Sequence, residues 1–85
     1  MSKISLINRL KLGELQCGER AIILLIAAPD EKLARRLMEM GLLEGAEAEL
    51  VHEAPLGGDP IAVRVRGTML ALRRAEANWI EVEKC

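Results

Sequence analysis

The amino-acid sequence predicts a mainly β fold: a small barrel of about five strands, with one α-helix inserted after the first main strand. The chain has 85 residues, 51% of them hydrophobic, which suits a single domain over residues 1–85 with its own core. Short segments of alternating apolar and polar residues follow one another between glycines, and a single segment has the apolar period of a helix. An open α+β sheet packed on that helix is the alternative.

The first main strand is predicted over residues 20–28, whose sequence is RAIILLIAA. It follows a turn-rich opening at residues 12–18, and its nearly continuous apolar side chains indicate cover on both faces. Pro29 ends this strand, because proline has no N–H group to donate to a neighbouring strand.

The helix is predicted over residues 30–40, DEKLARRLMEM. Asp30 is a suitable N-cap, since its short carboxylate can accept hydrogen bonds from amides of the first turn. Gly41 suits the left-handed conformation that ends a helix. The apolar residues of the segment share one side of the helix: Leu33, Ala34, Leu37, Met38 and Met40.

A period of two begins after Gly45 and predicts a hairpin. Residues 46–53 (AEAELVHE) and 61–66 (IAVRVR) alternate, and the loop between them, residues 54–60 (APLGGDP), has the glycines and prolines of tight turns. The side chains expected to point inward are Ala46, Ala48, Leu50, His52, Ile61, Val63 and Val65.

The C-terminal part continues with a turn at Gly67, a strand over residues 69–74, a short helical turn at residues 75–78 and a last strand over residues 79–83. Ile80 and Val82 are expected to point inward and Trp79 outward. Trp79 is the single aromatic residue, so the core must be aliphatic. The Trp79 ring is interpreted either as an interface anchor or as a cover for the barrel mouth.

The composition excludes several classes of function. Twelve basic and thirteen acidic residues give a formal net charge of −1, so no overall positive field attracts nucleic acid or an anionic membrane. The longest apolar run, residues 21–28, is shorter than the ~20 residues that a membrane span needs. The N-terminal segment also lacks the apolar stretch of a signal peptide. We therefore expect a cytoplasmic protein without direct membrane insertion.

Acidic and basic residues are separated along the chain. Residues 39–59 carry six acids and no Lys or Arg, whereas residues 60–75 carry four arginines and no acid. In the predicted hairpin, the acids expected to face Arg64 and Arg66 are Glu47 and Glu49. Cross-strand ion pairs are the favoured interpretation, and a partner surface with one acidic and one basic side is the alternative.

The sequence has no recognisable catalytic or phosphate-binding motif. His52, the single histidine, has no motif that would orient it toward a nucleophile, and no GxxxxGK[ST] loop is present. Cys17 and Cys85 are expected to be free thiols. Together with His52 they are weak candidates for metal ligands, because their spacing matches no zinc motif. We predict no enzyme, no cofactor and no dedicated metal site, with His52 as a core or loop histidine.

Met38 and Met40 lie near the end of the predicted helix. Packing into the core is the favoured interpretation of these two side chains. The alternative is an apolar contact patch, because methionine adapts readily to different partners.

A set of motifs runs in a fixed order along nearly the whole chain: LGEL at 12–15, Gly18, Ile22, RLMEMGL at 36–42, Gly45, APLGGDPI at 54–61, LALR at 70–73, Glu76-Ala77 and IEV at 80–82. In combination these motifs resemble the FeoA family, the small cytoplasmic component of bacterial ferrous iron transport. Two features depart from the family pattern. Glu44 stands where a proline is usual, and the loop has two glycines where many members have one.

The resemblance implies an SH3-like barrel and an accessory role with FeoB, a membrane permease that carries a GTP-binding domain. It also implies a likeness to the C-terminal domains of iron-dependent repressors. A helix end beside a loop makes a natural groove for a partner. The residues expected to contact the partner are Arg35, Arg36, Met38, Met40, Gly41, Leu42, Gly57, Gly58, Asp59 and Pro60.

The alternative from another class is a metal-responsive domain that binds iron or zinc through His52 with nearby carboxylates or thiols and acts on a regulator. An enzyme and an RNA-binding barrel rank below it. Metal retained after purification and lost in His52→Ala would favour the metal-responsive domain over an adaptor.

Overall fold

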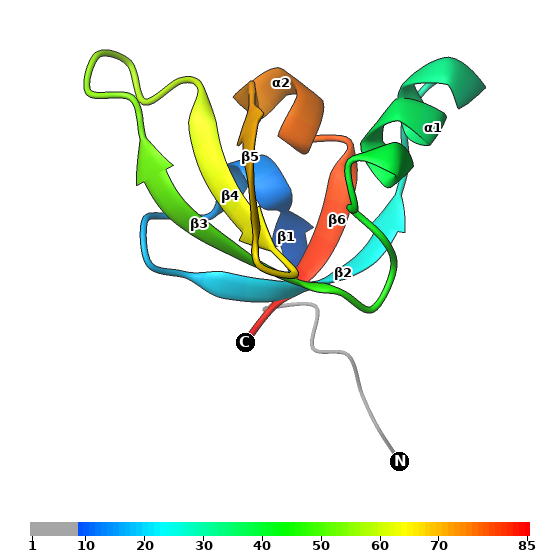
Figure 1. Cartoon of the computed structure of the whole chain (residues 1–85), viewed down its shortest axis with the longest axis horizontal. Helices are drawn as coiled ribbons and strands as arrows, with labels where there is room; N and C mark the ends of the chain where they lie inside the picture. The colour runs from blue at the N-terminus through cyan, green and yellow to red at the C-terminus, as the bar shows by residue number, and fades with distance from the viewer. Residues whose placement is uncertain (1–8) are drawn as a thin grey trace.

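The computed structural model describes residues 9–85, which form one six-stranded sheet with its helices at one end (Figure 1). The strand order is β1-β6-β2-β3-β4-β5, and all neighbouring strands are antiparallel. The elements in chain order are β1 (Arg9–Lys11), the 3₁₀ helix η2 (Leu12–Glu14), β2 (Arg20–Ile26), α1 (Glu31–Glu39), β3 (Glu47–Glu53), β4 (Ile61–Val65), β5 (Thr68–Leu72), α2 (Arg74–Ala77) and β6 (Ile80–Lys84).

The mainly β class is confirmed, with six strands among the described residues rather than about five. The strand missed from the sequence is β1, which has three residues and no readable alternation. It forms because it pairs with β6, where Leu10 lies opposite Val82 and Arg9 forms an ion pair with Glu81 at 2.6 Å.

The curved sheet encloses a single aliphatic core. Its members come from every strand except β1, from η2 and the residue after it, and from α1, α2 and the segment after α1. The largest fully buried side chains are Leu12, Leu15, Ile23, Leu37, Leu42, Leu50, Ile61, Leu72, Ile80, Val63, Val65 and Val82. The Trp79 side chain stays outside this core, as predicted, and is 40% exposed.

Helix α1 begins and ends where the sequence predicts. The Asp30 carboxylate accepts a hydrogen bond from the Leu33 amide at 2.8 Å, and Gly41 follows the helix with a φ of +101°. The stripe of apolar residues is narrower than predicted, because Met38 is 45% exposed. Leu37 is the buried centre of the stripe, and the next residue is turned by about 100° from it in an α-helix. The prediction that Met38 packs into the core is therefore wrong.

Strand β2 is shorter and less covered than predicted. It ends at Ile26, and only Ala21 and Ile23 are fully buried, while Leu24 and Leu25 are half-buried. One face of β2 is therefore buried, and the other face is only partly shielded from solvent, although both carry apolar side chains.

The β3–β4 hairpin forms as predicted except near the loop. Ala48 lies opposite Val65 and Leu50 opposite Val63, but the register then shifts between Leu50 and His52. A bulge of this kind reverses the alternation of faces, so His52 is exposed instead of pointing inward.

Ion pairs cross between strands on the outer face of the sheet. Glu49 pairs with Arg64 at 3.3 Å, as predicted for this hairpin. Glu47 instead pairs with Arg20 of β2 at 3.5 Å, because β3 has β2 as its second neighbour. Arg66 lies in the turn beyond β4 and does not pair with Glu47.

The β4–β5 hairpin turns through two residues, Arg66 and Gly67, whose φ angles are +53° and +79°. Positive φ at both central positions is typical of the type I′ turn that suits twisted hairpins. Strand β5 ends at Leu72, two residues before the predicted end, because α2 already begins at Arg74.

Candidate partner-binding surface

The helices and the β3–β4 loop lie at the same end of the molecule, and Figure 1 shows α2 between α1 and that loop. Helix α2 therefore separates the α1 exit from the 57–60 loop. The three segments are joined into one surface by side chains of α2, and these contacts were not predicted.

Arg74 joins α2 to the loop and to η2. Its Nε donates to the Gly58 carbonyl oxygen at 2.9 Å, and its Nη2 forms an ion pair with Glu53 Oε1 at 2.5 Å. Its Nη1 donates to the Gly13 carbonyl oxygen, and its backbone N–H donates to Asp59 Oδ1 at 2.9 Å. Arg74 therefore has four partners, which belong to the loop, to η2 and to β3, and these contacts hold the loop against α2.

Arg36 joins α1 to α2 through an ion pair with Glu76. The other carboxylate oxygen of Glu76 accepts a hydrogen bond from the Arg73 backbone N–H at 3.2 Å, which caps the start of α2. Because Glu76 is thus held at both oxygens, Arg36 is committed to a structural contact and offers less of its charge to a partner.

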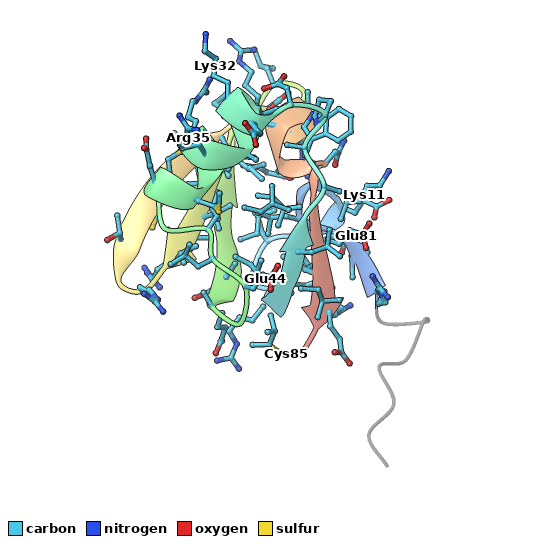
Figure 2. All side chains as sticks on the ribbon, turned by 90° about the vertical axis from the view of Figure 1, so that its right-hand side faces the viewer. Lys11, Lys32, Arg35, Glu44, Glu81 and Cys85 are labelled. Carbon is cyan, nitrogen blue, oxygen red and sulfur yellow. The ribbon has the colours of Figure 1, made fainter. Side chains whose placement is uncertain are left out.

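The predicted contact residues differ in exposure. The residues open to solvent are Arg35, Arg36, Met38, Gly57, Asp59 and Pro60. Met40, Gly41 and Gly58 are half-buried, whereas Leu42 is 0% exposed and can only support the surface from below. Figure 2 shows Lys32, which the prediction did not include, beside Arg35 on the outer side of α1.

Arg74 and Glu76 are the residues of this surface that sequence reasoning missed. Arg74 was visible as one of four arginines in the basic segment 60–75, and Glu53 and Asp59 belong to the acidic segment before it. The sequence separation between Arg74 and Glu53 is 21 residues, so no local pattern indicates which acid meets which arginine.

The described part of the structure does not gather the three weak metal-ligand candidates into one group of ligands. Cys17 is exposed in the turn before β2, His52 is exposed in β3, and Cys85 follows β6 at the end opposite α1 (Figure 2). Within residues 9–85, no three His, Cys, Asp or Glu side chains lie close enough together to hold an ion.

Two shallow depressions, with volumes of about 250 and 220 Å³, lie on the sheet and away from this surface. The first is lined by Arg9, Leu10, Lys11, Glu14 and Glu81, and the second by Glu47, Glu49, Arg64, Arg66 and Gly67. Neither includes a residue of α1 or of the 57–60 loop. None of the helices described here is long and apolar enough to cross a membrane.

A family model described as the FeoA domain matches residues 10–84. The chain belongs to the FeoA domain family. It is 35% identical over 74 residues to an Fe(2+) transport protein A/Fe(2+) transporter FeoB fusion protein of Porphyromonas gingivalis, a match that covers 87% of this chain and 8% of that relative. This FeoA-family chain therefore spans a small part of the length of that curated relative.

Solved FeoA structures share the fold of this FeoA-family chain. FeoA of Chlorobium tepidum is 44% identical, with a TM-score of 0.79, and the match covers 88% of this chain and 70% of that one. FeoA of Stenotrophomonas maltophilia, solved with zinc and described as an SH3 domain protein, is 34% identical with a TM-score of 0.74, covering 87% and 89%. The expected SH3-like architecture is confirmed.

Manganese-dependent transcriptional repressors share the fold at lower identity. Two of them are 17% and 18% identical, with TM-scores of 0.79 and 0.81, and this chain covers 42% and 37% of their lengths. At such identity the likeness concerns the fold alone.

Proposed function

We propose that this chain is a non-enzymatic accessory protein of ferrous iron uptake. It works in the cytoplasm, docks on the cytoplasmic part of a FeoB-type permease with a GTP-binding domain, and supports or regulates transport. Its place at the inner face of the membrane comes through that partner.

The observation that carries the proposal is the fusion relative, in which a FeoA sequence and a FeoB sequence occur in one polypeptide. A fusion raises the effective concentration of one part around the other, so it favours a contact between them. The same contact would be made here between separate chains.

The docking surface we propose consists of the outer side of α1 and the 57–60 loop, and we call it the α1–loop surface. It offers the exposed charges of Lys32 and Arg35 and the exposed thioether of Met38. Arg74 holds the loop in place, so little conformational entropy has to be lost when a partner binds. A rigid surface with two cations around an apolar side chain suits a protein partner.

The direct experiment titrates the purified cytoplasmic domains of the partner permease into this protein, with and without guanine nucleotide. We expect saturable binding in at least one nucleotide state. The double variant Arg35→Gln with Met38→Gln should weaken that binding by at least about tenfold, since both changes lie in the contact and neither side chain is buried.

Lys11→Gln is the matched control, because it also removes one exposed cation but lies on β1, away from the α1–loop surface. It should leave the affinity unchanged. No binding in any nucleotide state, together with normal iron uptake in a strain lacking this protein, would refute the adaptor role.

A further inference from the structure

Strand β5 is one edge of the sheet, because its single hydrogen-bonded neighbour among the described residues is β4. The two-residue turn makes Val65 and Thr68 a hydrogen-bonded pair, and such pairs alternate along an antiparallel ladder. The backbone groups of Leu70 therefore point to β4, whereas the N–H and C=O groups of Met69 and Ala71 point away from it. No other residue among 9–85 forms a hydrogen bond with these four groups.

The β5 edge has none of the features that normally prevent pairing with another chain. Its sequence, TMLAL, has no charge and no proline, and its ladder with β4 has no register shift. Met69 is 49% exposed and Ala71 is also exposed. The opposite edge, β1, differs, since it reads RLK and its Lys11 amide is bonded to Glu14 Oε1 at 2.7 Å.

An arginine stands at each end of the β5 edge. Arg66 precedes the strand in the turn, and Arg73 follows it, and both are exposed. Neither forms an ion pair with any residue between 9 and 85, and Arg66 also lines the depression that contains Glu47 and Glu49. Between the two arginines, the extended part of the edge is the five residues Thr68–Leu72, which at about 3.3 Å per residue span on the order of 16 Å.

We propose that the β5 edge binds an extended segment of another protein, which adds to the sheet beside β5 as a further strand. The segment has uncharged, alternating residues in its middle and an acidic residue near each end. Its backbone completes the hydrogen bonds of Met69 and Ala71, and its acids meet Arg66 and Arg73. Because the segment has an acidic residue at both ends, it can pair with β5 in either the parallel or the antiparallel direction. The inference does not depend on the proposed docking at the α1–loop surface.

A second copy of this chain fits the same edge poorly. In the symmetric antiparallel pairing that joins Met69 to Ala71 of the other copy, the register brings Arg66 near Arg73 of that copy at each end of β5. Like charges at both ends of the shared ladder oppose this pairing. An acidic segment meets the same two arginines with favourable charge.

The test uses a short synthetic peptide, fluorescently labelled, in which alternating Val and Thr residues lie between two acidic pairs. We expect saturable binding by fluorescence anisotropy. In NMR spectra, the amide signals of Met69 and Ala71 should shift and exchange more slowly with solvent. A peptide with Lys pairs at its ends should bind at least about tenfold more weakly, and a peptide with alternate backbone nitrogens methylated should not bind.

Two variants test separately the backbone hydrogen bonds of the β5 edge and the charges at its ends. Ala71→Pro removes an N–H group that points away from β4, so the fold should be retained while peptide binding is lost. Arg66→Asn removes one end charge and places a residue that tolerates positive φ in the turn, so binding should weaken without loss of stability. If Ala71→Pro fails to fold, Arg66→Asn and Arg73→Gln still test the proposal.

Lys11→Gln on the other edge is the control and should bind the peptide normally. Equal affinity for the acidic and basic peptides, signal shifts confined to residues outside β5, or concentration-dependent self-association at β5 would each overturn the proposal. Failure of the permease titration would leave these peptide results unaffected, so the two proposals can fail separately.

Discussion

Arg74 shows how much of the helical end depends on single residues. Its guanidinium contacts Gly58, Glu53 and Gly13, and its side chain is 26% exposed. Two of these partners are backbone carbonyl oxygens of residues far from Arg74 in sequence. Each accepts a hydrogen bond from the charged guanidinium. If the guanidinium is removed, these carbonyl oxygens lose their hydrogen-bond donor, and water reaches them less easily than it would on an open surface.

Arg74→Gln should lower the free energy of unfolding by about 1–3 kcal/mol, because a shorter neutral side chain cannot reach all three acceptors. Urea unfolding is the measurement. Arg73→Gln is the matched control, since Arg73 is adjacent and takes no part in an ion pair among the described residues. Equal loss of stability in the two variants would contradict the role given to Arg74.

Gly13 lies where η2 approaches α2, and its position leaves no room for a side chain. A Cβ atom added there would stand 2.9 Å from the Arg74 carbonyl oxygen and 2.3 Å from Asn78 Oδ1. Gly13→Ala should therefore destabilise the protein by about 1–3 kcal/mol in urea unfolding, because the backbone of α2 must shift.

The double variant Gly13→Ala with Asn78→Ala serves as the control for that prediction. Because the Asn78 side chain is shortened to a methyl group in this variant, part of the lost stability should be regained. The part of the loss that comes from the contact with the Arg74 carbonyl oxygen should remain. Full stability in the single variant would show that α2 does not pack closely on η2.

At the scale of elements, strands distant in sequence are joined near the C-terminus of the chain. Glu19, just before β2, forms an ion pair with Lys84 of β6 at 2.5 Å and accepts a hydrogen bond from the Gln16 amide at 2.7 Å. The hydrogen bond from Lys84 is the largest cause that lowers the pKa of Glu19, followed by the bond from Gln16. The charged carboxylate is therefore favoured in the folded protein.

A lowered pKa in the folded state stabilises the fold above the ordinary pKa of Glu19, and this contribution is lost as the pH falls through the lowered value. Lys84→Gln should consequently lower the melting temperature near neutral pH. The difference from the parent protein should shrink as the pH falls from the ordinary pKa of Glu19 through its lowered value, because the carboxylate is then protonated in both proteins. Thermal melts across this pH range are the measurement, and a constant difference at all pH values would contradict the role of the ion pair.

At the scale of the whole molecule, the fold rests on an aliphatic core and on hydrogen-bonded strands. Within residues 9–85 no group of three potential ligands is close enough to hold an ion. A chelator should therefore leave the melting temperature unchanged, because nothing that binds only the folded state is removed. A fall of several degrees, reversed by added zinc or iron, would favour the metal-responsive alternative.

Much of this architecture could be read from local patterns. Helix α1 was predictable because Asp30 and Gly41 mark its two ends and Leu37 centres its apolar stripe. The alternation of Val63 and Val65 with Arg64 likewise placed the inward face of β4. Such signals act within a few residues, so they do not depend on the rest of the fold.

The candidate surface was predictable only in part. The sequence pointed to the α1 exit and the 57–60 loop and placed both Leu42 and Met38 among the contact residues, although core packing was the favoured interpretation of the Met38 side chain. The structure buries the Leu42 side chain, at 0% exposed, and leaves the Met38 side chain 45% exposed, so only Met38 can touch a partner directly. Both are apolar and near a helix end, so hydrophobicity alone cannot tell which of them faces the core.

The sequence by itself determined the mainly β class, the aliphatic core, the helix and its caps, and the resemblance to the FeoA family. Only the tertiary structure decided three further features: strand β1, the exposure of His52 and the partners of Arg74. The physical reason is the same in each case. Pairing of β1 with β6, the register shift in β3 and the reach of Arg74 to Gly13 all depend on segments far apart in the chain, which meet only when the core closes.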